Sequence, residues 1–529
     1  MPINKNTNGN YTTRQLKLPL EIEKIIDISD PVYTFCDVME HIDLSKYFVE
    51  EKGYKTGRPR CESDKLIKVI LFAFMEHGIS SLRELEKLCK TDIRYIYLLD
   101  EMKAPSFATF GNFIRNELTT TVEMIFNDIN NYIFEQEHVD LNHTYIDGTK
   151  IEANANKYTW VWKKSCVKNR NKMFDKISAL IDSMNTGVLY MLDVKIEKRE
   201  EYAIEYIEDI LTNYEKVTCL DKTAFVSGKG HRKNIYQKQY QEMESYLNRL
   251  KTYAKHIEIC GDSRNSYSKT DHDATFMRVK SDYMGNGQLL PAYNMQVAIC
   301  DEYIAVIDAK PYASDMECFV PLMEKFKATY GHYPKYPVAD AGYGSYNNYL
   351  YCEEHGMEKY MKFTMFEKET KDNKYHNNPY RVNNFKRDSD GNLICPNGRR
   401  FIYKYDKKVR GNKYGRTEEV YECENCEECP YKKECCKKTK GNRTARLNRE
   451  LTSIHHKVIN NLESIQGALL CMNRSIQAEE TFGIIKWDRT YKRLFRRGSK
   501  SVILEFALIS CGYNLYKYHN KLNRQKKAA

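Results

Sequence analysis

Long apolar runs are missing from this sequence. The longest one in the first half extends only from Val69 to Met75, whereas a membrane-spanning helix needs roughly 18 or more apolar residues. The N-terminal segment MPINKNTNGNYTTRQ is polar and lacks the apolar stretch of a secretory signal peptide. The sequence therefore predicts a cytoplasmic protein that has no membrane partner.

A large excess of charge of one sign is also missing. Lys and Arg total 83 against 72 Asp and Glu, which gives a formal net charge of +11 over 529 residues. This balance is compatible with a polyanionic partner such as DNA, although solvated surface also accounts for much of it. Hydrophobic residues make up 42%, which allows a large buried core and excludes wholesale disorder.

Helical patterns dominate the N-terminal part. We expect residues 1–30 to form an arm and residues 31–134 to form a helical domain. Within it, Ser81 and Glu84 have the spacing of a capping box, which predicts a helix start. The short helices joined by turns resemble a helix-turn-helix bundle. DNA binding and a plain structural bundle are both compatible with this pattern, and we favour DNA binding.

Strand patterns begin at Thr144 and return at Tyr293–Cys300 and Tyr303–Ala309, followed by alternating helix and strand. Two adjacent strands and then this alternation predict an α/β fold with a mixed sheet flanked by helices. The expected catalytic domain consists of residues 140–162, 256–363 and 451–520. It is interrupted by a charged helical insert at 163–255 and a Cys-rich insert at 364–450, and a basic tail follows at 521–529.

Three carboxylates stand out by position. Asp147 and Asp340 lie at or near the ends of predicted strands, where reactive groups gather in open sheets. Glu479 lies on a predicted helix seven residues before Lys486, so both face nearly the same side. Each carboxylate taken alone could instead cap a turn or pair at the surface, and Glu480 competes with Glu479 for the same role.

The stretches that contain these residues resemble a known family. YIDGTKIEAN, VADAGYGS and NRSIQAEETFGIIK, in this order, are similar to the DDE transposases of bacterial insertion sequences. GRPR at Gly57–Arg60, SYSKTDHDATFMR and FRRGSKSVILEFALISCGYNLYKYHNK extend the resemblance to roughly residues 30–520. It is closest to the group with an N-terminal helical domain and a cysteine-rich insert before the catalytic glutamate.

The resemblance implies an RNase H-like fold, with Asp147 on the first strand, Asp340 at the end of a later strand and Glu479 on a C-terminal helix beside them. It also implies two divalent cations, Mg²⁺ or Mn²⁺, held by the three carboxylates for in-line phosphoryl transfer. The expected activity is binding of terminal inverted repeats, cleavage at the ends of the element and joining of 3′-hydroxyls to target DNA. The expected partner is double-stranded DNA, bound by a homodimer in a synaptic complex associated with the bacterial nucleoid.

One departure from the family limits what the resemblance carries over. Related transposases often have a tyrosine and an arginine at fixed spacing before the glutamate. Here Met472 occupies the tyrosine position, and Arg474 is one residue too far from Glu479. A hairpin route of cleavage is therefore not implied. An RNase H-like nuclease without strand transfer and an inactive zinc-containing DNA-binding protein stay open as alternatives.

Basic residues and aromatic residues alternate between Lys486 and Lys500. A basic segment beside the predicted catalytic glutamate is well placed to follow a phosphate backbone. The predicted DNA-binding residues are Lys486, Arg489, Lys492, Arg493, Arg496 and Arg497. Asp271 and Asp273 form a separate polar cluster, for which a structural turn and a role at the active site are equally compatible.

Six of the 17 cysteines crowd into residues 395–436, and the others are expected to be reduced, mostly buried thiols. The spacing of Cys426, Cys429 and Cys435, with Cys395 upstream, predicts a structural Zn²⁺ site. Such a site would fold a small polar insert that lacks its own core. Cys423 is an alternative to Cys395, Cys436 is a spare, and an iron–sulfur cluster is a weaker alternative to zinc.

Overall fold

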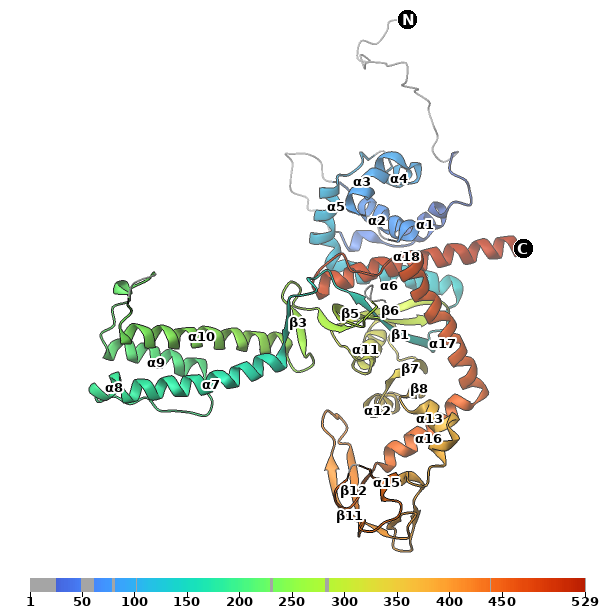
Figure 1. Ribbon diagram of the computed structural model, residues 1–529. Coiled ribbons are helices and arrows are strands. Elements are labelled where there is room, and N and C mark those ends of the chain that lie inside the picture. Colours follow the sequence, from blue (N-terminus) through green and yellow to red (C-terminus); the bar gives the residue numbers. More distant parts are fainter. Residues whose placement is uncertain are drawn as a thin grey trace, which may run out of the picture.

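The computed structural model (Figure 1) describes most of the chain. The described residues are 25–48, 61–78, 81–100, 102–228, 232–280, 285–437 and 439–528. Most of the predicted N-terminal arm and the GRPR motif lie outside them. No helix within these ranges is long and apolar enough to cross a membrane.

Helices form the N-terminal part, as predicted. Their starts follow local capping: the Ser81 hydroxyl accepts a hydrogen bond from the Glu84 N–H at 3.1 Å, and Ser106 accepts one from Thr109 at 3.2 Å. The predicted helix start at Ser81 is therefore confirmed. The helices are α1 (Pro31–Glu40), η3 (Leu44–Lys46), α2 (Ser63–His77), α3 (Leu82–Thr91), α4 (Ile93–Leu99), α5 (Phe107–Phe113), the π-helix η4 (Ile114–Leu118) and α6 (Thr119–Glu137).

A mixed sheet forms the centre of the molecule, which confirms the α/β prediction. Its strands are β1 (His143–Glu152), β4 (Thr275–Arg278), β5 (Leu289–Cys300), β6 (Tyr303–Lys310), β7 (Tyr336–Gly344) and β8 (Tyr360–Phe363). The order is β4-β5-β1-β7-β8, and β6 also pairs with β5. β5 is antiparallel to β1, β4 and β6, whereas β1, β7 and β8 are parallel. β5 and β6 are buried almost throughout: β5 lies between other strands, and β6, which pairs with β5 alone among the described strands, is covered by α18 (Ser499–Ala528) and α11 (Phe319–Tyr330).

The C-terminal helices cross this sheet and reach the N-terminal helices. One helix ends at Glu463, and the Ser464 side chain caps the next one. Gly467 allows the two helices to approach closely, because a Cβ there would lie 2.0 Å from the Asn461 carbonyl. α18 packs on α2, α6 and β6 and so joins both parts into one hydrophobic core (Figure 1). The helices of this region are η6 (Asp315–Glu317), α11 (Phe319–Tyr330), α12 (Tyr346–Glu354), α16 (Arg449–Glu463), α17 (Ile465–Gly483), the π-helix η8 (Ile484–Asp488) and α18 (Ser499–Ala528).

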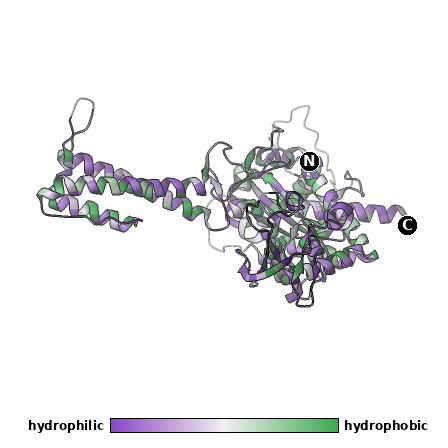
Figure 2. Ribbon diagram, turned by 60° about the horizontal axis from the view of Figure 1, so that its bottom comes forward, coloured by the Kyte–Doolittle hydropathy of each residue, from purple (hydrophilic) through white to green (hydrophobic). Residues whose placement is uncertain are grey.

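A helical arm projects from the body (Figures 1 and 2). The arm consists of the residues predicted as the helical insert. Hydrophilic and hydrophobic residues alternate along its helices (Figure 2), because one side of each helix packs into the arm's own hydrophobic core. The short strands β2 (Trp160–Trp162) and β3 (Ser266–Ser268) pair at its base. Its helices are α7 (Lys163–Thr186), α8 (Val188–Met191), α9 (Ile204–Val217), η5 (Lys222–Ala224) and α10 (Ile235–Cys260).

The cysteine-rich region forms a small lobe with a five-stranded antiparallel sheet in the order β13-β12-β11-β10-β9. Phe385, Leu393, Phe401 and Tyr421 are buried in a cluster at its centre. The expectation that this region lacks a core of its own was therefore wrong, because a few apolar residues from several strands meet in one cluster despite the polar composition. Its elements are α13 (Phe366–Lys371), α14 (Asn373–His376), η7 (Val382–Asn384), β9 (Lys386–Arg387), β10 (Leu393–Ile394), β11 (Arg400–Lys408), β12 (Thr417–Cys423), α15 (Lys432–Cys435) and β13 (Thr444–Leu447).

Candidate active site

Asp147 and Asp340 lie on neighbouring parallel strands. β1 and β7 pair in a register that places Tyr145 opposite Val338, and each aspartate follows two residues later on its strand. Burial raises the pKa of the Asp147 carboxyl, the nearby Arg474 opposes this shift, and the negative charge of Asp340 adds to it. The two carboxylates are therefore close enough to repel each other, as required of residues that share one cation site.

Both aspartates are anchored to backbone N–H groups of glycines. The Asp147 carboxylate accepts a hydrogen bond from Gly148 and the Asp340 carboxylate accepts one from Gly342, each at 2.8 Å. A Cβ on Gly148 would lie 2.2 Å from the Gln296 amide nitrogen and 2.8 Å from the Tyr343 hydroxyl. Glycine is needed after Asp147 because these buried side chains fill the space beside the strand.

Helix α17 passes over the face of β1 that carries Asp147. Asn473 donates to the Tyr145 hydroxyl at 3.3 Å, and an Arg474 guanidinium nitrogen lies 3.9 Å from a carboxylate oxygen of Asp147. Beyond the end of α17, in η8, the Lys486 ammonium donates to the Thr149 hydroxyl. Glu479 is exposed on α17, between the residues that make these contacts. Helix α17, which bears the third predicted carboxylate, therefore packs along β1, the strand that bears Asp147.

The structure distinguishes Glu479 from its neighbour Glu480. The Glu480 carboxylate accepts a hydrogen bond from the Lys517 ammonium of α18 at 2.6 Å, and Lys517 also pairs with Glu302 at 3.1 Å. These contacts direct Glu480 toward α18. Glu479 precedes Lys486 by seven residues on the part of α17 that leads into the site.

A divalent cation fits this donor set, although the site is not fully assembled. Within the described ranges, no three Asp, Glu, His or Cys side chains are grouped closely enough to hold a metal ion, so the structure does not group Glu479 with the two aspartates. The buried Tyr343 hydroxyl nevertheless has a pKa raised well above its ordinary value, by burial and then by the charges of Asp315, Asp147 and Asp340. Carboxylate oxygens and an excess of negative charge suit Mg²⁺ or Mn²⁺.

Two cationic residues beside the carboxylates were not predicted as site residues. Arg474 lies next to Asp147, as described above, and Lys280 is close enough to act on the charges of both Asp147 and Lys486. Burial lowers the pKa of the Lys486 ammonium, Lys280 lowers it further, and Asp147 opposes the shift. Lys280 belongs to no motif, and only the fold brings it to the site.

The predicted DNA-binding residues fall into two groups. Lys492, Arg493 and Arg497 are exposed, and the Lys492 ammonium lies 3.9 Å from the centre of the Trp487 ring. In contrast, Arg489 donates to the carbonyls of Phe74 and Met75 at 2.7 and 3.0 Å, which caps the C-terminal end of α2. Its guanidinium thus has a structural role, and we leave Arg489 out of the proposed DNA-contacting set.

The segment that carries the exposed basic residues is held in place from several sides. The Leu494 N–H donates to the Glu152 carbonyl at 2.8 Å, and Asn154 donates to the Phe495 carbonyl at 2.7 Å. The buried carboxylate of Glu505 accepts hydrogen bonds from the N–H groups of Phe495 and Arg496, each at 2.9 Å. Burial also lowers the pKa of Arg496, and Glu505 opposes this. Arg496 is therefore partly enclosed. The neighbouring Arg493 and Arg497 are exposed, but Arg493 pairs with Glu152 at 3.4 Å and Arg497 donates to the Asn154 carbonyl at 2.5 Å.

Asp271 and Asp273 have a structural role. The Asp273 carboxylate accepts a hydrogen bond from the Ser499 N–H at 2.8 Å, and that of Asp271 lies 3.4 Å from the Gly498 N–H. Negative charge at a helix N-terminus is stabilising, and α18 begins at Ser499. Tyr293 also donates to Asp271 at 3.0 Å. Of the two roles that the sequence left open, the structure supports helix capping.

The cysteines of the small lobe approach one another without forming a ready metal group. The pKa of the Cys423 thiol is raised to about 12. Burial is the largest cause, and a hydrogen bond with Cys426 and the charges of Cys426 and Cys395 also raise it. The Arg443 guanidinium donates to the Cys435 sulfur at 2.7 Å, and the Arg443 N–H donates to the Cys426 sulfur at 3.3 Å. Cys426 and Cys395 are therefore both neighbours of Cys423, while Cys429 is a partly buried free thiol.

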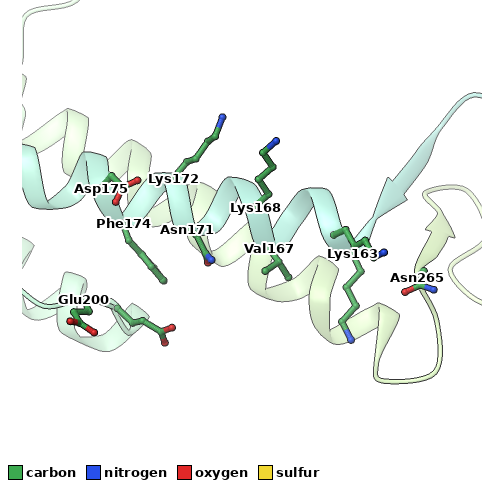
Figure 3. Close-up of a pocket in the computed structure, with 11 residues that line it drawn as sticks. Lys163, Val167, Lys168, Asn171, Lys172, Phe174, Asp175, Glu200 and Asn265 are labelled. Carbon is green, nitrogen blue, oxygen red and sulfur yellow. The ribbon is translucent and has the colours of Figure 1, made fainter. Parts of the chain in front are cut away.

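A hollow on the described surface lies elsewhere. It is a groove along α7 of the arm, where Lys168 and Lys172 project from the helix and Phe174 and Glu200 lie across from each other (Figure 3). None of the three predicted carboxylates lines it. The chemistry-bearing residues instead gather where β1, β7 and α17 meet.

Two family models match parts of the chain, and neither matched range includes Asp147 or Asp340. Residues 394–519 match the family model described as "Transposase DDE domain", and residues 20–116 match one described as "Transposase domain (DUF772)". The first match includes α17 with Glu479, and the second covers most of the N-terminal helices. Searches of curated proteins and of solved structures return no match. With one match in each half of the chain, these comparisons support a DDE-type transposase of an insertion sequence.

Proposed function

We propose that this transposase binds the terminal inverted repeats of its element, cleaves DNA at the ends and joins the 3′-hydroxyls to target DNA, as a homodimer that holds two ends together. The observation that carries the proposal is the juxtaposition of Asp147 and Asp340 on parallel strands beneath α17, which bears Glu479. Asp147 lies on the first strand of a mixed sheet, and Asp340 lies in the middle of β7, whereas the sequence predicted the end of a strand. This arrangement supports an RNase H-like fold.

Asp147, Asp340 and Glu479 would hold two Mg²⁺ or Mn²⁺ ions. Such ions supply an activated oxygen nucleophile and stabilise the leaving oxygen of an in-line displacement. The repulsion between Asp147 and Asp340 is relieved by cations, so binding of metal and closure of Glu479 onto the site support each other. Glu479 is exposed and its movement requires no loss of a buried contact.

The cationic residues around the carboxylates would orient the DNA. Lys486 and Lys280 lie within charge range of Asp147, where they can attract the phosphate next to the scissile bond. Arg474 balances the charge of Asp147 before the cations bind. We propose that the N-terminal helical domain recognises the terminal repeats, because phosphate contacts alone carry no sequence information.

A strand-transfer assay tests this function. The full chain is incubated with Mg²⁺, a pre-cleaved duplex that carries the terminal repeat found beside the gene, and a supercoiled plasmid. We expect plasmid molecules covalently joined to the end duplex. Hydrolysis of the DNA without joined products would identify a nuclease and contradict the proposal, and binding without either reaction would identify an inactive DNA-binding protein.

We expect the exposed basic segment to contribute to DNA affinity through charge. Replacing Lys492, Arg493 and Arg497 together by alanine removes up to three phosphate contacts, so the slope of log affinity against log salt should become shallower by about 2–3. The slope is measured by fluorescence anisotropy with end duplex from 50 to about 200 mM salt. The matched control is Lys164→Ala, Lys168→Ala and Lys172→Ala on the arm. An unchanged slope in the first variant would remove this segment from the interface.

We propose that the small lobe holds one structural Zn²⁺ through Cys426, Cys435, Cys429 and either Cys395 or Cys423. Thiolates suit Zn²⁺, and the Arg443 guanidinium donates to the Cys435 sulfur at 2.7 Å. Elemental analysis of the purified chain should give about one zinc per chain, and Cys426→Ser should lose it and melt at a lower temperature. Cys511→Ser, a buried cysteine of α18, is the control that should retain the metal. A metal-free wild-type chain would contradict the proposal.

A further inference from the structure

A buried chain of polar side chains lies directly behind the two aspartates. Asn294 and Gln296 on β5 and Tyr343 on β7 are almost completely buried, with at most 1% of each side chain exposed. Polar groups at such positions are costly unless each is hydrogen-bonded. Three neighbouring polar side chains in the centre of a sheet therefore need a reason beyond packing, because apolar residues would be less costly there.

The hydrogen bonds of this polar network lead mainly to Asp315, in the short helix η6, and the Asn294 amide also lies 3.8 Å from the Cys318 sulfur. The Asn294 amide donates to the Asp315 carboxylate at 2.6 Å, and the Gln296 amide lies 3.4 Å from the same oxygen. Gln296 also donates to the Asn294 side-chain oxygen at 2.9 Å. The Tyr343 hydroxyl in turn donates to the side-chain oxygen of Gln296. Asp315 is the acceptor at the end of this series.

The other end of this network of polar side chains contacts the backbone that carries the catalytic aspartates. Gln296 and the Tyr343 hydroxyl fill the space over Gly148, the residue after Asp147. At β7, a Cβ on Gly342 would lie 2.9 Å from an Asp340 oxygen and 3.2 Å from an Asp315 oxygen. The side chains thus support β1 next to Asp147 and β7 next to Asp340.

We propose that Asp315 is a positioning residue of the active site. Its carboxylate anchors the amides of Asn294 and Gln296, these orient the Tyr343 hydroxyl, and the network fixes the spacing between the strands that present Asp147 and Asp340. Without this acceptor, buried amide hydrogens lose their partner, and the two strand segments are free to shift. The inference rests on the proposed function, because the spacing matters only if both aspartates hold cations.

Three variants of the full chain test the role of Asp315. Asp315→Ala removes the acceptor, Asp315→Asn retains an oxygen that can accept from Asn294, and Glu317→Ala is the matched control at an exposed position of the same short helix. Positioning partners of metal ligands typically contribute 10–100-fold to activity or metal affinity. We expect Asp315→Ala to lower kcat for end cleavage at saturating Mg²⁺ by about 10–100-fold. KM for the end duplex should stay unchanged, and the asparagine variant should retain most of the rate.

A second measurement does not depend on catalysis. Binding of Mn²⁺ alone, followed by electron paramagnetic resonance, should be weakened by about 10-fold or more in Asp315→Ala and unchanged in Glu317→Ala. Full kcat in Asp315→Ala, or an asparagine variant as slow as the alanine variant, would overturn the inference; the latter would show that the charge rather than the hydrogen bond matters. If the wild-type chain does not cleave DNA, the proposed function fails, and Mn²⁺ binding still decides the role of Asp315.

Discussion

Replacing Asp147 or Asp340 by alanine is expected to abolish end cleavage and strand joining while DNA binding is retained. Each carboxylate faces the other on adjacent parallel strands, so neither can be replaced by a neighbour as a metal ligand. Removing a single group that stabilises charge in the transition state costs about 10²–10³-fold in rate, and removing a ligand of the cations should cost at least this much. Gel assays of cleavage and anisotropy measurements of DNA binding on the same preparations separate the two properties.

Asp308→Asn is the matched control for these variants. Asp308 is a buried aspartate on β6 of the same sheet, but it pairs with Lys310 at 3.1 Å. Its replacement should alter stability more than cleavage at a temperature where the chain is folded. Normal cleavage by Asp147→Ala or Asp340→Ala would show that the affected residue is not a ligand. Loss of DNA binding in either variant would instead indicate a folding defect.

Stability in the absence of metal provides an independent readout for Asp147. Burial raises the pKa of this carboxyl in the folded chain, and the charge of Asp340 adds to the shift. The ionised form is therefore less favourable in the folded chain than in the unfolded one, and this contribution lowers stability as the pH rises through the raised pKa. Asp147→Asn should accordingly be at least as stable as the wild type at neutral pH without metal, and Mg²⁺ should stabilise only the wild type.

Periodic and local features of the sequence predicted much of the fold. The capping residue Ser81, the strands around Asp147 and Asp340, and the alternation of helix and strand depend on neighbours in the chain, so they are visible without a structure. The break at Ser464 escaped prediction because apolar residues continue on both sides of it. The core of the cysteine-rich lobe escaped because its strands are short and separated by polar turns.

Roles that depend on contacts between distant segments could not be predicted. Arg489 is a basic residue in a basic segment, as expected of a DNA-binding position. Its guanidinium nevertheless caps α2, more than 400 residues earlier in the chain. Lys280 and Asp315 belong to no recognisable motif and reach the site only through folding. Arg474 was noted in the sequence as a departure from the family spacing, and the structure places it 3.9 Å from Asp147.

The adjacent residues Glu479 and Glu480 provide the sharpest comparison in this chain. Glu479→Gln is expected to reduce cleavage and joining by at least about 10²–10³-fold, because it removes the charge of the third ligand while keeping its size. Glu480→Gln leaves that ligand intact and removes the ion pair between Glu480 and Lys517. Because the Glu480 side chain is partly exposed, losing this pair should lower the free energy of unfolding by at most about 1 kcal/mol.

Both variants are assayed for cleavage, joining and thermal unfolding under the same conditions. The structure places the Glu480 carboxylate 2.6 Å from the Lys517 ammonium of α18, so its loss should lower the melting temperature slightly and leave the rate nearly unchanged. Because the two residues differ by one position on one helix, a general effect on α17 would slow both variants alike. The opposite pattern, with Glu480→Gln inactive and Glu479→Gln active, would require α17 to be rotated in the DNA-bound state and would reassign the third carboxylate to Glu480.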